Sequence, residues 1–193
     1  LGDGIYLTQD SLAFREMLKM EWPDDQQIFI DVASPVRTAL MFSQFAKCYY
    51  VDPRGLHEWY ASIMAASLGM AWVKEEGQRL TDSFPEKCVP LVTSLHAPEH
   101  FGLGRYGDEV DFDGTFKFFQ EVHKVLEDDG IFMFSVPVST EPRIEFHNAR
   151  VYGPEILEQL MKDTGFTPLN IYIILGAPNE LSDPESDPEL DYN

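Results

Sequence analysis

The stretch Leu91–Pro137 decides the fold; it reads LVTSLHAPEHFGLGRYGDEVDFDGTFKFFQEVHKVLEDDGIFMFSVP. An apolar run leads into a turn that carries His96, Glu99 and His100. A glycine-rich loop, an amphipathic segment and a second apolar run at Ile131–Val136 follow. Because the apolar residues change from a strand pattern to a helical period and back, the stretch predicts a strand, a polar turn, a helix and a second strand.

The rest of the chain repeats this alternation. Short apolar runs bounded by polar residues predict strands at Ile28–Val32, Cys48–Val51, Ala71–Val73, Val89–Leu95, Ile131–Val136 and Pro168–Leu175. Helical spacing predicts helices from Thr8 or Asp10 to Met20, over residues 34–46 with Ser34 as N-cap, and over 57–68, 114–126 and 154–162. Residues 75–87 and 140–152 are expected to be polar connections. The alternation predicts an α/β fold with a Rossmann-like, doubly wound, mostly parallel sheet in three α/β/α layers.

Composition predicts one domain over residues 1–176, in which the N-terminal helix of residues 1–22 is a candidate lid. Residues 177–193 contain six acids and no Lys or Arg, which predicts a disordered acidic tail. The formal net charge of −19 disfavours nucleic acids and anionic membrane surfaces as partners. There is no visible signal peptide and no apolar run of about 20 residues, so we expect no membrane span and favour a cytoplasmic location. The oligomeric state is left open.

Two patterns of metal-binding type are present, and neither fits well. The letters His96-Ala97-Pro98-Glu99-His100 match H-x-x-E-H, but Pro98 keeps the two histidines off one helical face. A run that begins at Glu109 half-resembles a calcium loop, but its twelfth position is Gln120. We therefore expect no metal. We also expect the two cysteines, Cys48 and Cys88, to be thiols and not a disulfide.

Ligands of open parallel sheets bind at the carboxyl ends of the strands. The candidate segments there are Asp31–Pro35, Asp52–Gly55, Glu75–Gln78 and Ser94–His100. A histidine or glutamate of the last segment could act as a general base, or these groups could only hold the loop. A further polar cluster of the 140–152 connection either contacts substrate or is solvated; it comprises Arg143, Glu145, His147, Asn148 and Arg150.

Together these segments resemble the class I S-adenosylmethionine (SAM)-dependent methyltransferases, over about Ile28–Leu175. The matching pieces are Ile30-Asp31-Val32, Val51-Asp52, Glu76–Leu80, Ser94–His100, Leu126–Gly130, Ser135-Val136-Pro137, Arg150–Leu157 and Gly165-Phe166. The run HFGLGRYGD, with RIEF and ARVY downstream, looks closest to an uncharacterised methyltransferase-like family, DUF268.

The resemblance implies SAM as cofactor and assigns a role to each candidate residue. Asp52 would hold the ribose, and Glu76, Gly77 and Gln78 would face the adenine. The methionine end would be surrounded by Asp31, Ala33, Ser34, Ser94 and Leu95. The base would be one of His96, Glu99, His100 and His147.

One departure from the family pattern keeps two functions open. The family's first turn is rich in glycine, whereas this chain has Ala33-Ser34-Pro35. The first function is a SAM-dependent methyltransferase acting on a small molecule, a sugar or another glycan, or a protein side chain. The alternative is a catalytically inactive methyltransferase-fold protein that serves in binding or as a scaffold.

Overall fold

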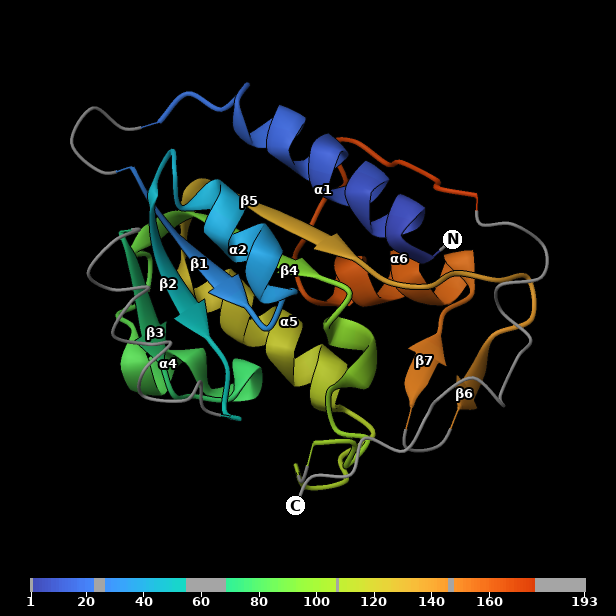
Figure 1. Ribbon diagram of the computed structural model, residues 1–193. Helices are drawn as coiled ribbons and strands as arrows, with labels where there is room; N and C mark the ends of the chain where they lie inside the picture. Colours follow the sequence, from blue (N-terminus) through green and yellow to red (C-terminus); the bar gives the residue numbers. More distant parts are fainter. Residues whose placement is uncertain (1, 23–26, 55–68, 107, 146–147, 176–193) are drawn as a thin grey trace, which may run out of the picture. The chain divides into compact units, whose positions relative to one another are not determined.

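The computed structural model describes residues 2–22, 27–54, 69–106, 108–145 and 148–175. The expected helix of residues 57–68 and the acidic tail lie outside this part of the chain. The chain divides into two compact units (Figure 1), one made of residues 1–19 and 170–193 and the other of residues 20–169.

The larger unit is built on a sheet of five parallel strands in the order β3-β2-β1-β4-β5. The strands are β1 (Ile28–Val32), β2 (Lys47–Val51), β3 (Met70–Val73), β4 (Val89–Leu95) and β5 (Leu126–Ser135). The strand order reverses between β1 and β4, which makes the gap between their carboxyl ends the switch point of the fold. The predicted mostly parallel sheet is confirmed.

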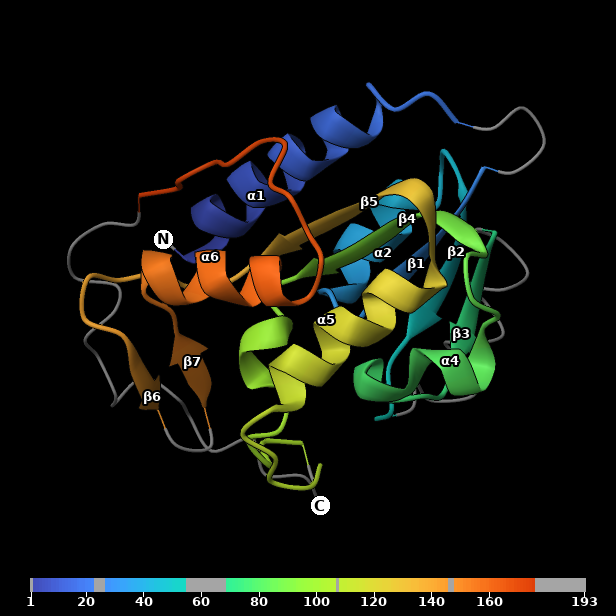
Figure 2. The ribbon, with the colours of Figure 1, turned by 180° about the vertical axis from the view of Figure 1, so that it is seen from behind.

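Helices cover both faces of this sheet (Figures 1 and 2). The helix α2 (Val36–Phe42) lies in front of the sheet in Figure 1, and α5 (Gly114–Val125) lies in front in the reversed view of Figure 2. Two further helices pack on the α5 side, α4 (Leu80–Ser83) and α6 (Pro154–Asp163). This arrangement gives the predicted α/β/α layers.

Burial follows the apolar pattern of the sequence. All seven residues of β4 are buried, as expected for a central strand of a parallel sheet. The apolar face of α5 packs on the sheet through Phe118, Phe119, Val122 and Val125. Phe118 also meets Phe101 edge-on, with ring centroids 4.8 Å apart, which ties the loop after β4 to the core.

Several element ends differ from the expectation. The first helix, α1 (Gly2–Met17), begins and ends earlier than predicted. Ser34 does not cap α2, because Pro35 is the N-cap residue and the Ser34 hydroxyl bonds elsewhere. β5 begins at Leu126 and not at the expected Ile131, and it includes Asp129, which has a φ of +65°.

Two segments differ in kind. The connection expected at 140–152 contains an antiparallel pair, β6 (Arg143–Glu145) with β7 (Ala149–Val151). The sequence did not predict these strands, because they are short and charged and show no alternation of apolar and polar residues. Residues 168–175, expected as a strand, form none; within the smaller unit Tyr172 instead donates a hydrogen bond of 2.8 Å to Glu16 of α1.

Other connections agree with their sequence signals. The 75–87 connection holds a short 3₁₀ turn, Gly77–Arg79, before α4. Gly165 follows the C-cap residue of α6 with a φ of +86°, the left-handed conformation that glycine commonly adopts after a helix. Both cysteines are free thiols. Among the helices that the structure describes, none combines the length and apolar character needed to cross a membrane.

Candidate functional site

The turns that follow β1 and β4 share an unusual backbone conformation. Ala33 and His96 each follow a strand and have φ values of 55° and 52°. The left-handed region costs a residue with a Cβ about 1–2 kcal/mol. The Ala33 N–H donates to the Val51 carbonyl at 2.9 Å, which helps to hold this turn. The glycine-free turn therefore adopts a conformation that glycine would take more readily, at the switch point of the sheet.

Asp31 supports the first of these turns from below. Its side chain is fully buried, and the Thr93 hydroxyl donates to Oδ2 at 2.6 Å. The backbone N–H of Ser34 donates to Oδ1 at 3.2 Å. Both carboxylate oxygens therefore bond to the chain itself, one to β4 and one to the turn.

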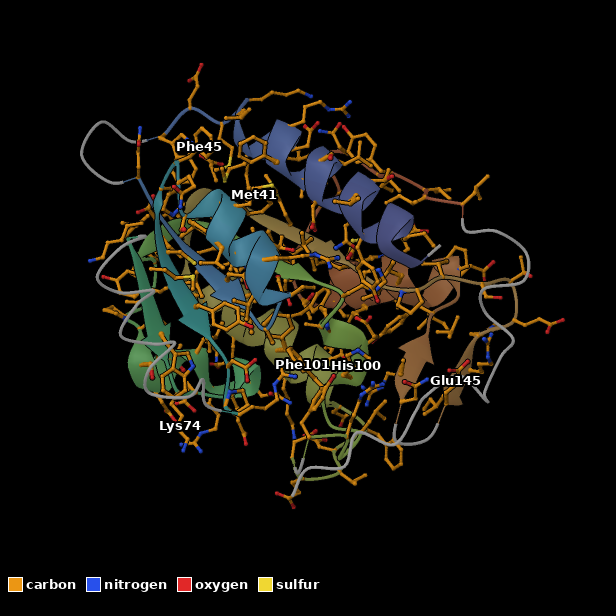
Figure 3. All side chains as sticks on the ribbon, viewed as in Figure 1. Met41, Phe45, Lys74, His100, Phe101 and Glu145 are labelled. Carbon is orange, nitrogen blue, oxygen red and sulfur yellow. The ribbon has the colours of Figure 1, made fainter. Side chains whose placement is uncertain are left out.

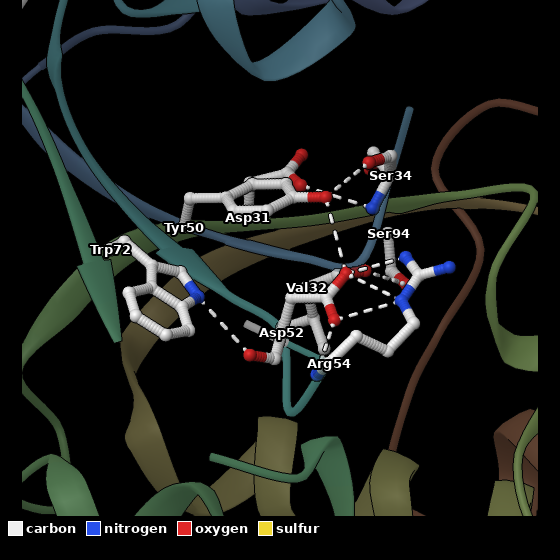
Figure 4. A network of polar contacts seen from close by, with 8 residues as sticks. All are labelled: Asp31, Val32, Ser34, Tyr50, Asp52, Arg54, Trp72 and Ser94. Carbon is white, nitrogen blue, oxygen red and sulfur yellow. Dashed lines mark hydrogen bonds and ion pairs between the residues drawn. The ribbon is translucent and has the colours of Figure 1, made fainter. Parts of the chain in front are cut away.

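Hydrogen bonds also join the ends of β1 and β4 directly. The Ser94 hydroxyl donates to the Val32 carbonyl at 2.8 Å (Figure 4). The Leu95 N–H donates to the Ser34 hydroxyl at 2.8 Å. Tyr50, buried in β2, donates to the Ser34 carbonyl at 2.9 Å. The candidate residues Ser34, Ser94 and Leu95 thus come together across the switch point.

Asp52 follows β2 and is only 3% exposed. Nε of Arg54 donates to Oδ1 at 2.9 Å and a terminal nitrogen donates to Oδ2 at 2.5 Å (Figure 4). The Arg54 backbone N–H also donates to Oδ1 at 2.9 Å. These contacts raise the pKa of Arg54 above its usual value, with the hydrogen bond to Asp52 as the largest cause. The sequence did not lead us to predict this pair, although an arginine two residues after an acid at the end of a strand could have suggested it.

The segment expected at the adenine surrounds the 3₁₀ turn after β3. Gly77 is buried, and a Cβ there would lie 3.0 Å from side-chain atoms of Val32 and Phe118. Core packing therefore accounts for this glycine. Glu76 and Gln78 flank it and are half-buried.

Glu99 lies in a short 3₁₀ turn, Pro98–His100, and is only 2% exposed. Its Oε1 lies 3.0 Å from Nδ1 of His96 and 3.8 Å from Nε2 of His100. Its Oε2 is buried and has no hydrogen-bond partner among the described residues. The structure brings these three candidates together, while His147 lies outside the described residues.

His100 points toward the β6–β7 pair (Figure 3), where its Nδ1 lies 2.5 Å from the Asn148 carbonyl oxygen. Burial lowers the pKa of His100 below its usual value, against the opposing effect of the Glu99 charge. The neutral ring then donates from Nδ1 to that carbonyl. Among the residues described, no three His, Cys, Asp or Glu side chains are arranged to hold a metal ion.

The glycine-rich loop after this turn is folded around a carboxylate. Gly102 and Gly104 have φ values of +72° and +73°. Their N–H groups donate to Oδ2 of Asp108 at 3.1 and 3.2 Å, and the Tyr106 N–H donates to Oδ1 at 3.1 Å. The loop presents the Tyr106 ring to Arg54, with 4.4 Å between the guanidinium carbon and the ring centroid. Nothing in the sequence pointed to this contact.

Arg150 was one of the residues left open as a substrate contact or a solvated side chain. It is 7% exposed and donates to the carbonyls of Phe101, Asp111 and Phe112, at 3.4 and 3.2 Å for the last two. The solvated interpretation is wrong, because the buried guanidinium holds the glycine-rich loop against β7; contact with a substrate stays a prediction.

Solved structures that share this fold include several methyltransferases and a cyclase. The 1,6-didemethyltoxoflavin-N1-methyltransferase of Burkholderia thailandensis, solved with S-adenosylhomocysteine, is 16% identical with a TM-score of 0.65, covering 84% of this chain and 68% of that one. A SAM-dependent methyltransferase of Archaeoglobus fulgidus is 16% identical with a TM-score of 0.60, at 84% and 69% coverage. The [4+2]-cyclase SpnF is 15% identical with a TM-score of 0.61, at 84% and 57%. These likenesses establish the class I methyltransferase fold.

No match is found among curated proteins. The family model described as "Caenorhabditis protein of unknown function, DUF268" matches residues 59–177, which is more than half of the chain. The matched region includes β4, the His–Glu turn, the glycine-rich loop and α5. The chain belongs to the DUF268 family.

Proposed function

We propose that this chain is a SAM-dependent methyltransferase that acts on a small molecule, a sugar or a protein side chain. The observation that carries the proposal is the place of Asp52. This nearly buried acid ends β2, beside the switch point of a β3-β2-β1-β4-β5 sheet. An acid at that place has two oxygens that can accept hydrogen bonds from the two ribose hydroxyls of a nucleoside. Two of the solved neighbours are named as methyltransferases, which supports the same assignment.

The donors and acceptors at this edge of the sheet fit the cofactor, provided that Arg54 moves. Its side chain is 43% exposed, so it can rotate toward solvent and release the Asp52 carboxylate. Ser34, Ser94 and Leu95 would hold the amino-acid end of the cofactor through hydroxyl and backbone groups. The left-handed turn at Ala33 follows a backbone path of the kind that a glycine-rich turn takes.

The cofactor would supply a methyl group that is already activated on a sulfonium. The chain must then position the acceptor and, for a hydroxyl, remove its proton. His96 is the proposed base, because it follows β4 at the switch point with its Nδ1 on the Glu99 carboxylate. A carboxylate at Nδ1 fixes the ring and stabilises the imidazolium that forms when the base takes a proton. His100, kept neutral by burial, would line the same turn.

Calorimetric titration with SAM and with S-adenosylhomocysteine tests the proposal. We expect saturable binding by the wild-type chain that Asp52→Ala abolishes. Asp128→Ala is the matched control, since it removes an acid that also pairs with a cation but lies on the exposed surface at 84% side-chain exposure. Equal binding by all three proteins would separate the ligand from Asp52 and contradict the proposed site.

A second candidate, the catalytically inactive binding or scaffold protein, is favoured by one observation. The groups expected to hold the cofactor already have partners within the chain, since Leu95 bonds to Ser34 and Asp52 bonds to Arg54. The cyclase SpnF also has this fold, so the fold by itself does not specify methyl transfer. A folded protein that binds neither ligand, even after Arg54 is removed, would favour this alternative.

A further inference from the structure

The Asp52 carboxylate is already occupied by the chain's own guanidinium. Arg54 donates to Oδ1 from Nε and to Oδ2 from a terminal nitrogen, which is the two-point contact that arginine makes with carboxylates (Figure 4). Two ribose hydroxyls would need the same two oxygens. A nucleoside and the Arg54 side chain therefore compete for one acceptor group.

The two partners differ in their freedom to move. Asp52 has 4% of its side chain exposed and Arg54 has 43%. The Asp52 backbone is held by Trp72, whose indole N–H donates to its carbonyl at 3.1 Å. Rotation of Arg54 would leave Oδ1 with the Arg54 backbone N–H and Oδ2 with the Tyr50 hydroxyl at 3.4 Å. The carboxylate would then stay in place with acceptor capacity on both oxygens.

Tyr106 holds the guanidinium from its other side. The Arg54 guanidinium carbon lies 4.4 Å from the Tyr106 ring centroid, a distance at which cation–π attraction is significant. The same ring meets His100 edge-on at 5.9 Å. The loop around Asp108 fixes the Tyr106 backbone, so the Tyr106 ring links the glycine-rich loop to His100 and, through Arg54, to Asp52.

We infer that Arg54 acts as a latch, because its guanidinium occupies Asp52 and so closes the nucleoside site. Tyr106 holds this guanidinium in place, and a ligand with free 2′ and 3′ ribose hydroxyls displaces it. This inference rests on the proposed function and adds a regulation to the same site. The apparent affinity for a nucleoside is therefore the intrinsic affinity multiplied by the fraction of time that Asp52 is free. The latch also couples nucleoside binding to the glycine-rich loop, because the displaced guanidinium either loses its contact with the Tyr106 ring or moves the ring with it.

The test is titration of S-adenosylhomocysteine into the wild-type chain, Arg54→Ala, Tyr106→Ala, Asp52→Ala and Lys87→Ala. We expect Arg54→Ala to lower the Kd by about tenfold and Tyr106→Ala to lower it by a smaller factor. Lys87→Ala removes one positive charge from another exposed ion pair and should leave the Kd unchanged. Added salt should bring the wild-type Kd toward that of Arg54→Ala, because screening weakens a partly exposed ion pair.

The outcomes separate the latch from the proposed function. Tighter binding by Arg54→Ala supports the latch, including the case in which the wild-type chain binds too weakly to detect. Weaker or unchanged binding by Arg54→Ala overturns it, while binding that depends on Asp52 leaves the proposed function standing. Absence of binding in every folded variant rejects both. If Arg54→Ala does not fold, Tyr106→Ala decides, since its exposed ring can be removed without touching Asp52.

Discussion

Two buried carboxylates lie close to the switch point, and they are satisfied very differently. Asp31 in β1 is fully buried, and each of its oxygens accepts a hydrogen bond from the chain. Glu99, in the turn after β4, is equally buried, but only Oε1 meets polar partners among the described residues. A satisfied buried acid fixes a backbone, whereas an unsatisfied one costs stability and is more often retained for chemistry.

The difference assigns separate tasks to the two strand ends. The Asp31 network builds the turn and joins β1 to β4 through Thr93 and Ser34. The Glu99 network places a carboxylate against two imidazoles, at a position where an acid and a base could exchange a proton. We therefore expect substitutions at Asp31 to act on stability and substitutions at Glu99 to act on titration behaviour.

The largest expected effect on stability is at Asp31, whose two carboxylate oxygens both accept hydrogen bonds. Asp31→Ala leaves the Thr93 hydroxyl and the Ser34 N–H buried without an acceptor, so we expect a loss of about 3 kcal/mol in the free energy of unfolding. Urea denaturation followed by far-UV circular dichroism measures it. Thr93→Val, which removes one donor from the same network, should cost less. A loss below about 1 kcal/mol for Asp31→Ala would mean that the network does not support the turn.

Substitution of Glu99, whose Oε2 has no hydrogen-bond partner among the described residues, should change the free energy of unfolding less. Glu99→Gln replaces the buried carboxyl group by an amide of the same shape that can still bond to His96, so the free energy of unfolding should change by about 1 kcal/mol or less. Glu121→Gln is a useful comparison, because that carboxylate accepts two bonds from Thr81 and one from Lys124. A greater loss at Glu99 than at Glu121 would remove the contrast between satisfied and unsatisfied acids.

The contrast was only partly predictable from the sequence. β1 and β4 were predicted with their observed bounds because each is a short apolar run between polar residues. The crowding of His96, Glu99 and His100 was predicted because they are close in the chain. That Asp31 is satisfied depends on Thr93, 62 residues away in sequence, and strand pairing alone brings the two together.

The rest of the site depends on loop geometry that carries no periodic signal. Arg54 meets Tyr106 across 52 residues, and the path between them includes the glycine turns around Asp108. Arg150 was expected in a polar loop, yet it is buried, and its guanidinium donates to three backbone carbonyls of another loop. Local propensity predicts elements well and predicts poorly which loop will fold over which strand end.

A smaller effect tests whether the turn above Asp31 is strained. Ala33→Gly removes the left-handed penalty but gives the unfolded chain more freedom, so we expect a net stabilisation of about 0.5–1 kcal/mol. Ala39→Gly, in helix α2, should have the opposite sign and cost about 1 kcal/mol or more. Thermal and urea unfolding of both variants check the pair of signs. Destabilisation by Ala33→Gly would mean that the Ala33 methyl group packs usefully in the turn.

The smallest effect concerns the charge of Glu99 itself. Burial lowers the pKa of His100, while the Glu99 carboxylate raises it in part. Because Glu99 opposes the effect of burial, Glu99→Gln should lower the pKa of His100 further, as NMR titration of the imidazole protons would record. A depressed histidine pKa contributes stability above the unfolded value of about 6.5, and this stability is lost as the pH falls through the folded pKa.

The wild-type free energy of unfolding should therefore decrease below about pH 6.5 relative to a His100→Asn variant. The difference between the two proteins should be larger in the Glu99→Gln background, where the folded pKa of His100 lies lower. An unchanged His100 titration in Glu99→Gln would contradict the proposed electrostatic effect of Glu99 on His100 and leave burial as the cause of its lowered pKa.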